Sequence, residues 1–239
     1  MTKLQVPIDI GDGAPIVVLH GFAMKPATYG RLAKVLAERC RVVIPDLFAI
    51  RGKWSYEDVL AGFTSVLDDR GLDRVTLLGH SFGGGIELGF AAKYPERVVE
   101  LVFSDTLADS REWGLATEAL RHPAHIMWLA TPQATRAFAA NAVEHPRQLI
   151  GAGLWAFRST RALQIQEIAR RHIPSHVLWA NRDSILSRPD GQNFARDLGA
   201  DFTLASPTDR KVVDHDWMFE QPDLFVRQLE KLDLEALSS

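Results

Sequence analysis

A serine between two glycines is the strongest candidate for a reactive group in this chain. Residues 79–83 read Gly-His-Ser-Phe-Gly, after a strand-like run over 74–78 and before a helix-like run over 84–94. A tight strand-to-helix turn of this kind lifts the serine hydroxyl clear of the backbone, and glycine two residues away on either side avoids a collision. The helix behind the turn points backbone N–H groups toward developing negative charge. The pattern predicts that Ser81 is a nucleophile.

Attack by a serine hydroxyl requires a base and a group that orients the base. Six histidines follow Ser81, but only His215 lies after the last expected strand and before the last expected helix. A loop that leaves the carboxyl end of a strand places its side chains at the edge of the sheet where the serine lies. We therefore predict that His215 is the base. Asp183 and Asp105 each come just after an expected strand, so either carboxylate could orient it.

A histidine–glycine pair, His20-Gly21, ends the first expected strand and is followed by Phe22. The backbone N–H groups of Phe22 and Phe82 could together donate hydrogen bonds to a negatively charged oxygen, and Gly21 lets the backbone approach a substrate closely. The imidazoles of His20 and His80 flank these donors. We expect both to bond the backbone of nearby loops rather than to move protons.

The elements that must position these side chains alternate along the chain. Strand-like apolar runs and helix-like runs follow one another over 1–106 and again over 173–239, whereas 107–172 is helix-like without a good strand. Near-continuous apolar strands are typical of a parallel sheet that helices cover on both faces. We expect an α/β three-layer sandwich as the core, with 107–172 inserted as a helical cap over the carboxyl edge of the sheet. The expected strands are 16–19, 41–44, 75–78, 98–103, 176–180 and a weak one near 202–205 or 211–213; the expected core helices are 26–39, 56–70, 84–94, 191–198 and 217–231.

The composition is that of an ordinary globular protein. The chain has 239 residues, 46% of them hydrophobic and 24% charged, which suits one domain with an ample core. The net charge of −3 argues against a nucleic-acid surface, no apolar run is long enough to span a bilayer, and no secretory signal is visible. The single cysteine, Cys40, excludes an internal disulfide and a cysteine-based metal cage, and we expect it to be buried. We therefore expect a cytoplasmic protein.

Together these features resemble the α/β-hydrolase fold, in the form that carries a small helical cap. The resemblance rests on the tight turn at Ser81 (residues 79–83), which we call the elbow, on the His-Gly pair, and on the order Ser81, Asp183, His215 along the chain. It covers nearly the whole chain and is weakest over the cap. It implies an eight-stranded, mostly parallel sheet with a Ser–Asp–His triad at its carboxyl edge. It also favours Asp183 over Asp105 as the acid, because Asp183 matches the usual loop of the family.

Two stretches depart from the pattern of this family. After Pro45-Asp46 the family often continues with a Gly-His-Gly turn, whereas residues 47–52 read Leu-Phe-Ala-Ile-Arg-Gly, so the wall of the site should differ there. The residue before the catalytic histidine is commonly glycine, and here it is Asp214. Ionised carboxylates at Asp214 and Asp216 would favour the protonated imidazole.

The serine at the elbow limits the reactions that the site could catalyse. Dehalogenases and epoxide hydrolases of this fold resemble one another in using aspartate at that position, so acyl transfer remains. We expect a carboxylic-ester hydrolase in which Ser81 attacks a carbonyl, His215 takes the proton, and Asp183 orients His215, with no metal or organic cofactor required. A carbon–carbon-bond hydrolase or a thioesterase would use the same triad, and a low-turnover ligand receptor of this fold could retain it. These alternatives stay open.

The expected cap is rich in aromatic residues. Some of them should face the pocket that a cap closes, and an apolar acyl or alcohol group is the natural ligand there. We take Trp113, Trp128 and Trp155 as candidate substrate-binding residues.

The expected cap also has an excess of arginine. Residues 108–172 contain eight arginines, no lysine and five acidic residues. A solvated outer helix face accounts for this composition. The sharper alternative is an anionic partner, either a carboxylate-bearing substrate or an acidic acyl-carrier protein, which the forked guanidinium groups of Arg158 and Arg161 could bind.

Overall fold

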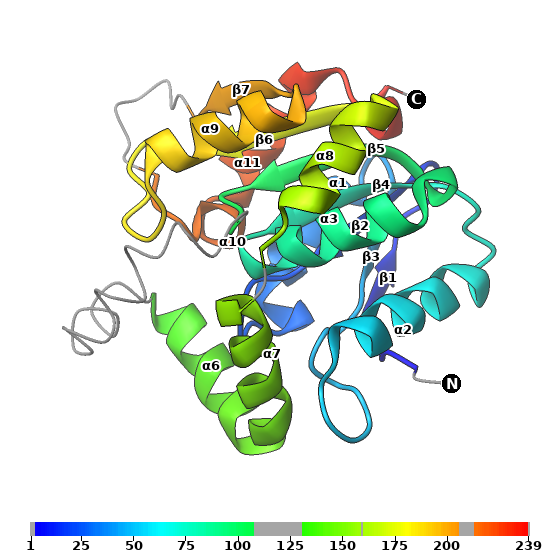
Figure 1. Ribbon diagram of the computed structural model, residues 1–239, viewed down its shortest axis with the longest axis vertical. Helices are drawn as coiled ribbons and strands as arrows, with labels where there is room; N and C mark the ends of the chain where they lie inside the picture. The colour runs from blue at the N-terminus through cyan, green and yellow to red at the C-terminus, as the bar shows by residue number, and fades with distance from the viewer. Residues whose placement is uncertain (1–2, 108–130, 159, 206–212, 239) are drawn as a thin grey trace.

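The computed structural model describes residues 3–107, 131–158, 160–205 and 213–238. Its centre is a seven-stranded sheet in the order β1-β3-β2-β4-β5-β6-β7, with helices on both faces (Figure 1). β1 runs antiparallel to β3, and the other neighbouring strands are parallel. The strands are β1 (Ile8–Ile10), β2 (Pro15–Leu19), β3 (Arg41–Ile44), β4 (Val75–His80), β5 (Val98–Ser104), β6 (Ser175–Trp179) and β7 (Asp201–Leu204).

The expected α/β sandwich with a mostly parallel sheet is confirmed, but the expected number of eight strands is not met among the described residues. The weak final strand forms over Asp201–Leu204, the first of its two expected positions. The sequence reading missed β1, because its three residues Ile-Asp-Ile alternate at an exposed edge instead of forming a continuous apolar run.

The helices begin and end at recognisable signals. Ser55, Thr131 and Ser187 each accept a backbone N–H at the start of a helix through the side-chain hydroxyl. The expected single helix over 217–231 is divided in two, because Pro222 starts a new helix. The helices are η1 (Pro26–Tyr29), α1 (Gly30–Leu36), α2 (Tyr56–Asp68), α3 (Phe82–Lys93), η2 (Pro95–Arg97), α6 (Pro132–Glu144), α7 (Pro146–Arg158), α8 (Ala162–Arg171), α9 (Arg188–Leu198), α10 (Trp217–Glu220), α11 (Pro222–Leu229), η4 (Glu230–Leu232) and η5 (Glu235–Leu237).

Two hydrophobic clusters lie on the two faces of the sheet. In β2, for example, Val17 and Leu19 face one cluster, whereas Ile16 and Val18 face the other. The first cluster also takes residues from α2, α3, α8 and α9, and the second takes residues from α1, α10 and α11. The three layers thus follow from strands whose side chains are apolar on both faces.

The α6–α7 hairpin lies apart from the helices that cover the sheet (Figure 1). The Asn141 side chain of α6 donates hydrogen bonds to the carbonyls of Ala23 (2.8 Å) and Met24 (3.0 Å), in the loop after β2. The Gln148 side chain of α7 donates to the carbonyls of Ile50 (3.2 Å) and Gly52 (2.9 Å), in the loop after β3. Both loops leave the carboxyl ends of strands, so the hairpin is fixed at that edge of the sheet.

α8 also belongs to the expected cap, but it packs against α3 and α9 in the layer on the sheet. Its residues Ile165 and Ile168 are buried in the first hydrophobic cluster. The part of the expected insertion over 108–130 lies outside the described residues. The division into a core and a cap over 107–172 therefore stays a prediction.

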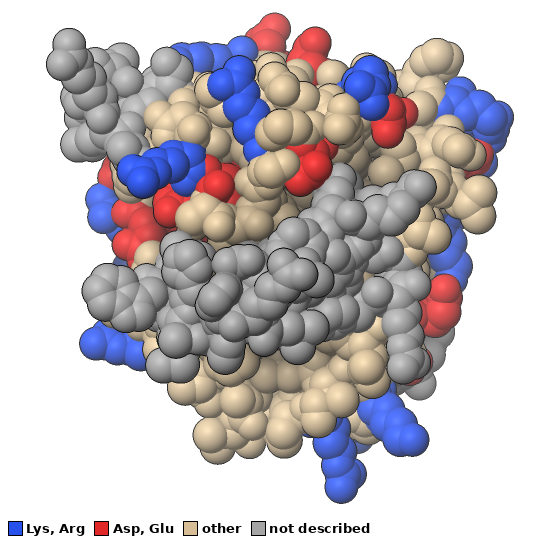
Figure 2. All heavy atoms as spheres, turned by 60° about the vertical axis from the view of Figure 1, so that its left-hand side comes forward, with Lys and Arg blue, Asp and Glu red and all other residues tan. Residues whose placement is uncertain are grey.

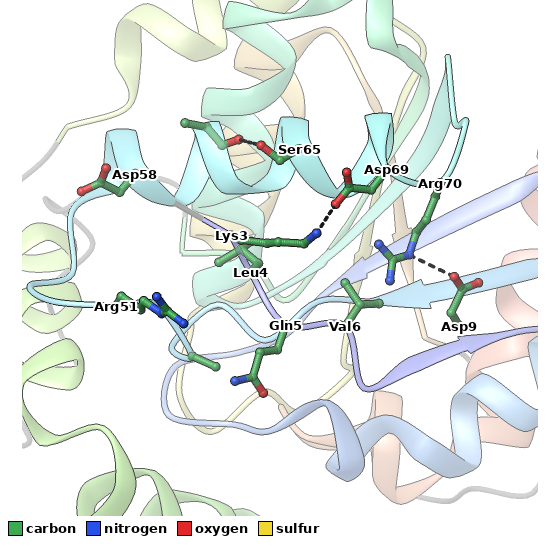
Figure 3. Close-up of a pocket in the computed structure, with 12 residues that line it drawn as sticks. Lys3, Leu4, Gln5, Val6, Asp9, Arg51, Asp58, Ser65, Asp69 and Arg70 are labelled. Atoms are coloured by element: carbon green, nitrogen blue, oxygen red, sulfur yellow. Dashed lines mark hydrogen bonds and ion pairs between the residues drawn. The ribbon is translucent and has the colours of Figure 1, made fainter. Parts of the chain in front are cut away.

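A charged hollow of about 1430 Å³ lies between the N-terminal segment and α2 (Figure 3). Lys3 pairs with Asp69 at 2.7 Å, and Arg70 pairs with Asp9 at 3.0 Å. These ion pairs tie the segment that leads into β1 to the C-terminal end of α2. None of the candidate catalytic residues lines this hollow. Among the described helices, none has the length and apolar character that a membrane crossing needs.

The N-terminus of α3 approaches the end of β2 so closely that Gly83 has no room for a side chain. A methyl group on Gly83 would lie 2.0 Å from the carbonyl oxygen of Leu19 and 2.9 Å from that of His20. Because these neighbours are backbone atoms, we expect Gly83→Ala to lower the free energy of unfolding by about 3 kcal/mol or more. Urea unfolding monitored by circular dichroism measures this change.

Gly30 is the matched control. It is helical, with φ −61°, and a methyl group there would meet nothing within 4 Å. Gly30→Ala should be neutral or should stabilise the protein by about 0.4–1 kcal/mol. Equal effects of the two substitutions would mean that the close seating of α3 on β2 does not restrict residue 83.

Candidate active site

Ser81 occupies a strained turn between β4 and α3. Its φ of 51° and ψ of −114° are unfavourable for any residue other than glycine. The turn is held by neighbouring backbone: the Ser81 N–H donates to the carbonyl of Ser104 at 3.0 Å, and the Ser81 carbonyl accepts from the N–H of Gly84 at 3.1 Å. The geometry is that of the elbow which the sequence predicts.

Asp183 and His215 are in direct contact. His215 Nδ1 lies 2.9 Å from Asp183 Oδ2, and the other oxygen of Asp183 accepts the backbone N–H groups of Ile185 (2.7 Å) and Leu186 (2.8 Å). An ionised carboxylate only accepts hydrogen bonds, so His215 Nδ1 carries a proton, and in the neutral imidazole Nε2 keeps its lone pair. The two loops are also joined where Arg182 N–H donates to the carbonyl of Val213 at 3.1 Å.

His215 lies beside the elbow. Its ring centroid is 5.0 Å from that of His80, the residue before Ser81, and its carbonyl oxygen is 3.0 Å from His80 Nε2. The structure thus brings the predicted base and acid together and sets the base next to the nucleophile turn. That the three side chains act as a triad remains a prediction.

Asp105, the rival acid, is fully buried but does not hydrogen-bond to His215. Its carboxyl group accepts hydrogen bonds from the N–H of Ala180 (2.7 Å), from Trp217 Nε1 (2.6 Å) and from the Ser104 hydroxyl (2.9 Å). Burial, together with the charge of Asp183, raises the pKa of Asp105 to about 8. Asp105 therefore braces the ends of β5 and β6 against α10.

The pKa of His215 is set by competing effects. Burial alone would lower it, but the charge and the hydrogen bond of Asp183, followed by the charges of Asp216 and Asp105, raise it to about 9. Burial raises the pKa of Asp216 to about 6, although the charge of His215 opposes this. Asp214 Oδ1 accepts hydrogen bonds from the backbone N–H groups of Ser184 (2.8 Å) and His215 (2.7 Å). The expected effect of its charge on the imidazole stays a prediction.

This balance predicts an alkaline activity profile. Only the neutral imidazole can take a proton, so kcat/KM should rise with pH and level off above about pH 9. Asp216→Asn removes one of the charges that favour the imidazolium, and the rising limb should move to lower pH. Each unit by which the pKa of His215 falls raises the neutral fraction at pH 7 about tenfold. Initial rates between pH 5 and 10 measure the shift.

Asp223→Asn is the control of equal charge, because Asp223 is exposed on α11 and pairs with Arg31. In this variant kcat/KM should rise over the same pH range as in the parent protein. An equal shift in both variants would mean that the change in net charge alone moves the pH profile. Stability supplies a second check. Because the pKa of His215 is raised from 6.5 to about 9, its stabilising contribution is complete below pH 6.5 and is lost as pH rises to 9.

The residues proposed as oxyanion donors lie next to each other. The rings of Phe22 and Phe82 are 5.7 Å apart, and Gly83 seats the start of α3 against the end of β2. Phe82 is the first residue of α3, where a backbone N–H has no partner within the helix. The arrangement suits the oxyanion hole, which stays a prediction.

An aromatic wall adjoins these donors; we use this term for Phe22, Phe48, Trp54, Phe82 and Trp155. Trp155 of α7 contacts Phe82 edge-on at 5.4 Å and Trp54 at 5.6 Å. The structure thus places one of the three candidate substrate-binding tryptophans against the elbow. Trp113 and Trp128 lie outside the described residues.

The sequence reading did not single out Phe48 or Trp54. Phe48 stacks on Phe82 at 5.8 Å, and Trp54 lies 5.9 Å from the same ring. Phe48 lies in the stretch 47–52 that departs from the Gly-His-Gly turn of similar proteins, and Trp54 follows it closely. The unusual sequence of residues 47–52 was therefore the signal that could have pointed to these two aromatic residues.

Among the described residues, the arginines of the expected cap differ in their surroundings. Arg161 is only 2% exposed, and its guanidinium lies 4.5 Å from the centre of the Trp155 ring. Arg170 and Arg171 both pair with Glu167, at 2.7 and 2.5 Å. On the face drawn in Figure 2, basic and acidic side chains of the described residues are interspersed. The side chain of Arg158 lies outside the described residues.

Two groups of side chains in the described part of the chain are close enough to share a metal ion. They are His80, His215 and Asp216, and Asp105, Asp183 and His215. Each group contains the imidazole of His215, whose Nδ1 already bonds Asp183. Both groups therefore belong to the candidate catalytic site already described.

Comparisons with known proteins agree with this fold. The family model described as the alpha/beta hydrolase family matches residues 16–228. A 2-hydroxy-6-oxo-2,4-heptadienoate hydrolase of Pseudomonas putida is 34% identical over 114 residues, 44% of this chain and 41% of that protein. A 2-hydroxymuconate semialdehyde hydrolase of Pseudomonas putida is 32% identical over 111 residues, 43% of this chain and 40% of that protein. The match thus spans about two fifths of the length of each relative.

Solved structures match over nearly the whole chain at low identity, which shows the fold alone. A thermophilic esterase from Thermogutta terrifontis has a TM-score of 0.73 and 20% identity, over 98% of this chain and 94% of that one. The enol-lactonase from Burkholderia xenovorans LB400 has a TM-score of 0.72 and 17% identity, over 97% and 96%. The family match over residues 16–228 confirms the resemblance seen in the sequence, and the chain belongs to the alpha/beta hydrolase family.

Proposed function

We propose that this protein is a serine hydrolase that cleaves a carboxylic ester through an acyl-enzyme on Ser81. The observation that carries the proposal is the 2.9 Å contact between His215 Nδ1 and Asp183, on loops that meet beside the strained serine turn. A strained backbone persists at a site where the rest of the fold holds it, and such sites are often functional.

Each side chain has a defined part in the reaction. Ser81 Oγ attacks the carbonyl carbon while His215 Nε2 takes its proton, and Asp183 stabilises the imidazolium that forms. The N–H groups of Phe22 and Phe82 donate to the oxyanion of the tetrahedral intermediate. His215 then gives its proton to the leaving alcohol. In the second half, His215 takes a proton from water as the water oxygen attacks the acyl carbon. His215 then gives this proton to Ser81 Oγ as the bond from that oxygen to the acyl carbon breaks and the acid is released.

The aromatic wall supports an apolar group on the substrate. Phe82 lies at the elbow, and both Trp155 and Phe48 contact its ring. Phe22 and Trp155 are the half-buried members of the wall. An acyl or alcohol group placed beside the elbow would lie against these two rings and lose contact with water, which favours binding. A carboxylate on the substrate has weaker support, because Arg161 is buried against Trp155.

A carbon–carbon-bond hydrolase is the second candidate. Two relatives that are 34% and 32% identical over part of the chain are named as hydrolases of 2-hydroxy-6-oxo-2,4-heptadienoate and of 2-hydroxymuconate semialdehyde. Ser81, His215 and Asp183 could serve such a reaction as well, since the pocket rather than the triad selects the bond.

One assay separates these functions. The protein is incubated with short-chain aryl esters, thioesters and vinylogous diketones, each with and without prior treatment with a fluorophosphonate probe. We expect ester turnover that is lost as Ser81 is labelled, with the site mapped by peptide mass spectrometry. Turnover of diketones but not of esters would establish the second candidate. Labelling without turnover of any substrate would indicate a receptor, and neither labelling nor turnover would overturn the serine chemistry.

A further inference from the structure

A chain of buried hydrogen bonds joins three loops of the candidate site. The backbone N–H of Gly21 donates to the Tyr29 hydroxyl at 3.0 Å, and this hydroxyl lies 2.7 Å from His80 Nδ1. His80 Nε2 lies 3.0 Å from the carbonyl oxygen of His215. Tyr29 and His80 are both buried. The chain thus runs from the loop of the oxyanion donor Phe22 through the elbow to the loop of the base.

The groups at the two ends fix the direction of every proton in this chain. A peptide N–H only donates and a peptide carbonyl only accepts. The Tyr29 hydroxyl accepts from Gly21, so its own proton goes to His80 Nδ1. His80 then carries its proton on Nε2 and donates it to the His215 carbonyl. Burial first, and then the charge of His215, lower the pKa of His80 to about 3, which keeps this imidazole neutral.

The surroundings leave the chain little freedom to rearrange. Phe219 packs edge-on against the rings of Tyr29 (5.3 Å) and His80 (6.0 Å). A methyl group on Gly21 would lie 3.1 Å from His80 Nδ1 and 3.5 Å from the Tyr29 hydroxyl, so the backbone of the oxyanion loop is pressed against both groups. Fully satisfied buried polar networks of this kind are rigid.

We propose that Tyr29 and His80 are positioning residues that hold the oxyanion loop and the base loop in fixed register with Ser81. The inference rests on the proposed serine hydrolase function. In the transition state the N–H of Phe22 and the imidazole of His215 must act on the same substrate at the same moment. Because both loops are tied to the residue that precedes Ser81, the three groups are held as one unit. A displacement of about 1 Å in such a unit lowers the rate about 10²-fold.

The first test removes one hydroxyl. Tyr29→Phe keeps the ring but leaves the Gly21 N–H and His80 Nδ1 without their shared partner. We expect kcat for an aryl ester to fall about 10- to 100-fold. KM should change less than about twofold, because this tyrosine does not belong to the aromatic wall. Tyr94→Phe is the matched control, since Tyr94 lies at the far end of α3 and packs on Phe90. It should leave kcat unchanged.

The second test breaks the other end of the chain. The side chain of His80→Asn still offers an acceptor to Tyr29 but no longer reaches the His215 carbonyl as a donor. It should lower kcat by a similar factor. If the two residues act through one chain of hydrogen bonds, kcat of the double variant should be no lower than kcat of the less active single variant. This second variant also keeps the inference testable if Tyr29→Phe does not fold.

A third measurement does not depend on turnover. In protein with ¹⁵N-labelled histidine at pH 7, His80 should be a neutral imidazole with its proton on Nε2. In Tyr29→Phe its Nδ1 resonance should move toward that of a nitrogen without a hydrogen bond. A proton on Nδ1 in the parent protein would overturn the inference.

The kinetic outcomes are separable. Ester turnover in the parent protein with kcat unchanged in folded Tyr29→Phe overturns the inference alone. A lower melting temperature with unchanged kcat assigns the chain a structural role and also overturns it. If the parent protein is neither labelled by the fluorophosphonate nor active on any substrate, the proposed function fails, and the positioning role fails with it even where the spectrum finds the proton on Nε2.

Discussion

Ser81→Ala is expected to lower kcat by a factor on the order of 10⁶, because no other group can form the acyl-enzyme. The same substitution should leave the free energy of unfolding nearly unchanged, since alanine is strained in the same way at φ 51°. Ser81→Gly should be equally inactive but more stable, by about 1 kcal/mol, because glycine adopts this conformation without a steric penalty. Single-turnover kinetics and urea unfolding measure the two effects.

Ser65 provides the matched control for stability. It lies in the middle of α2 with ordinary helical geometry, so Ser65→Gly should destabilise the protein by about 0.5 kcal/mol. The two serine-to-glycine substitutions should thus change the free energy of unfolding in opposite directions. Substantial ester turnover by Ser81→Ala would exclude Ser81 as the nucleophile, and a loss of stability in Ser81→Gly would mean that the elbow is not strained.

Asp183→Asn is expected to lower kcat about 10⁴-fold. The amide removes the charge that stabilises the imidazolium of His215, and its N–H₂ group can hold the imidazole in the wrong tautomer. The raised pKa of His215 depends first on Asp183 among the charged groups, so the rising limb of the pH profile should also move to lower pH. Steady-state kinetics between pH 5 and 10 measure both changes.

Asp105→Asn separates the two carboxyl groups. Asp105 bonds Trp217, Ala180 and Ser104 but not His215, so kcat of the folded variant should fall less than about tenfold. An amide N–H₂ group turned toward Trp217 Nε1 would oppose two donors, which should lower stability by about 1–3 kcal/mol. A large loss of kcat in Asp105→Asn with little loss in Asp183→Asn would reverse the assignment of the acid.

Local patterns sufficed to predict the parallel core of this fold. Runs such as 16–19 and 101–103 are apolar on both faces, and a sheet covered by helices on each side buries them. The strained serine turn was also visible, because it depends on glycines within two residues of Ser81. β1 escaped detection, since its pairing with β3 depends on partners more than thirty residues away.

The contacts that complete the site could not be read from local patterns. Asp105 and Asp183 both follow strands, and only the folded loops show which carboxylate reaches His215. Tyr29 read as one apolar position of a helix, whereas its hydroxyl reaches His80, 51 residues away. The different placement of the helices expected in the cap was equally hidden, because α8 has the same helical periodicity as α6 and α7 but packs against α3 and α9.

The amide side chain of Asn141 links the α6–α7 hairpin to the loop that carries Phe22. Asn141 grips the carbonyls of Ala23 and Met24, one and two positions beyond Phe22. Any displacement of the α6–α7 hairpin would therefore act on the short peptide that carries the N–H of Phe22, the proposed oxyanion donor. In the proposed mechanism, a displaced hairpin would move the Phe22 N–H and weaken its hydrogen bond to the oxyanion.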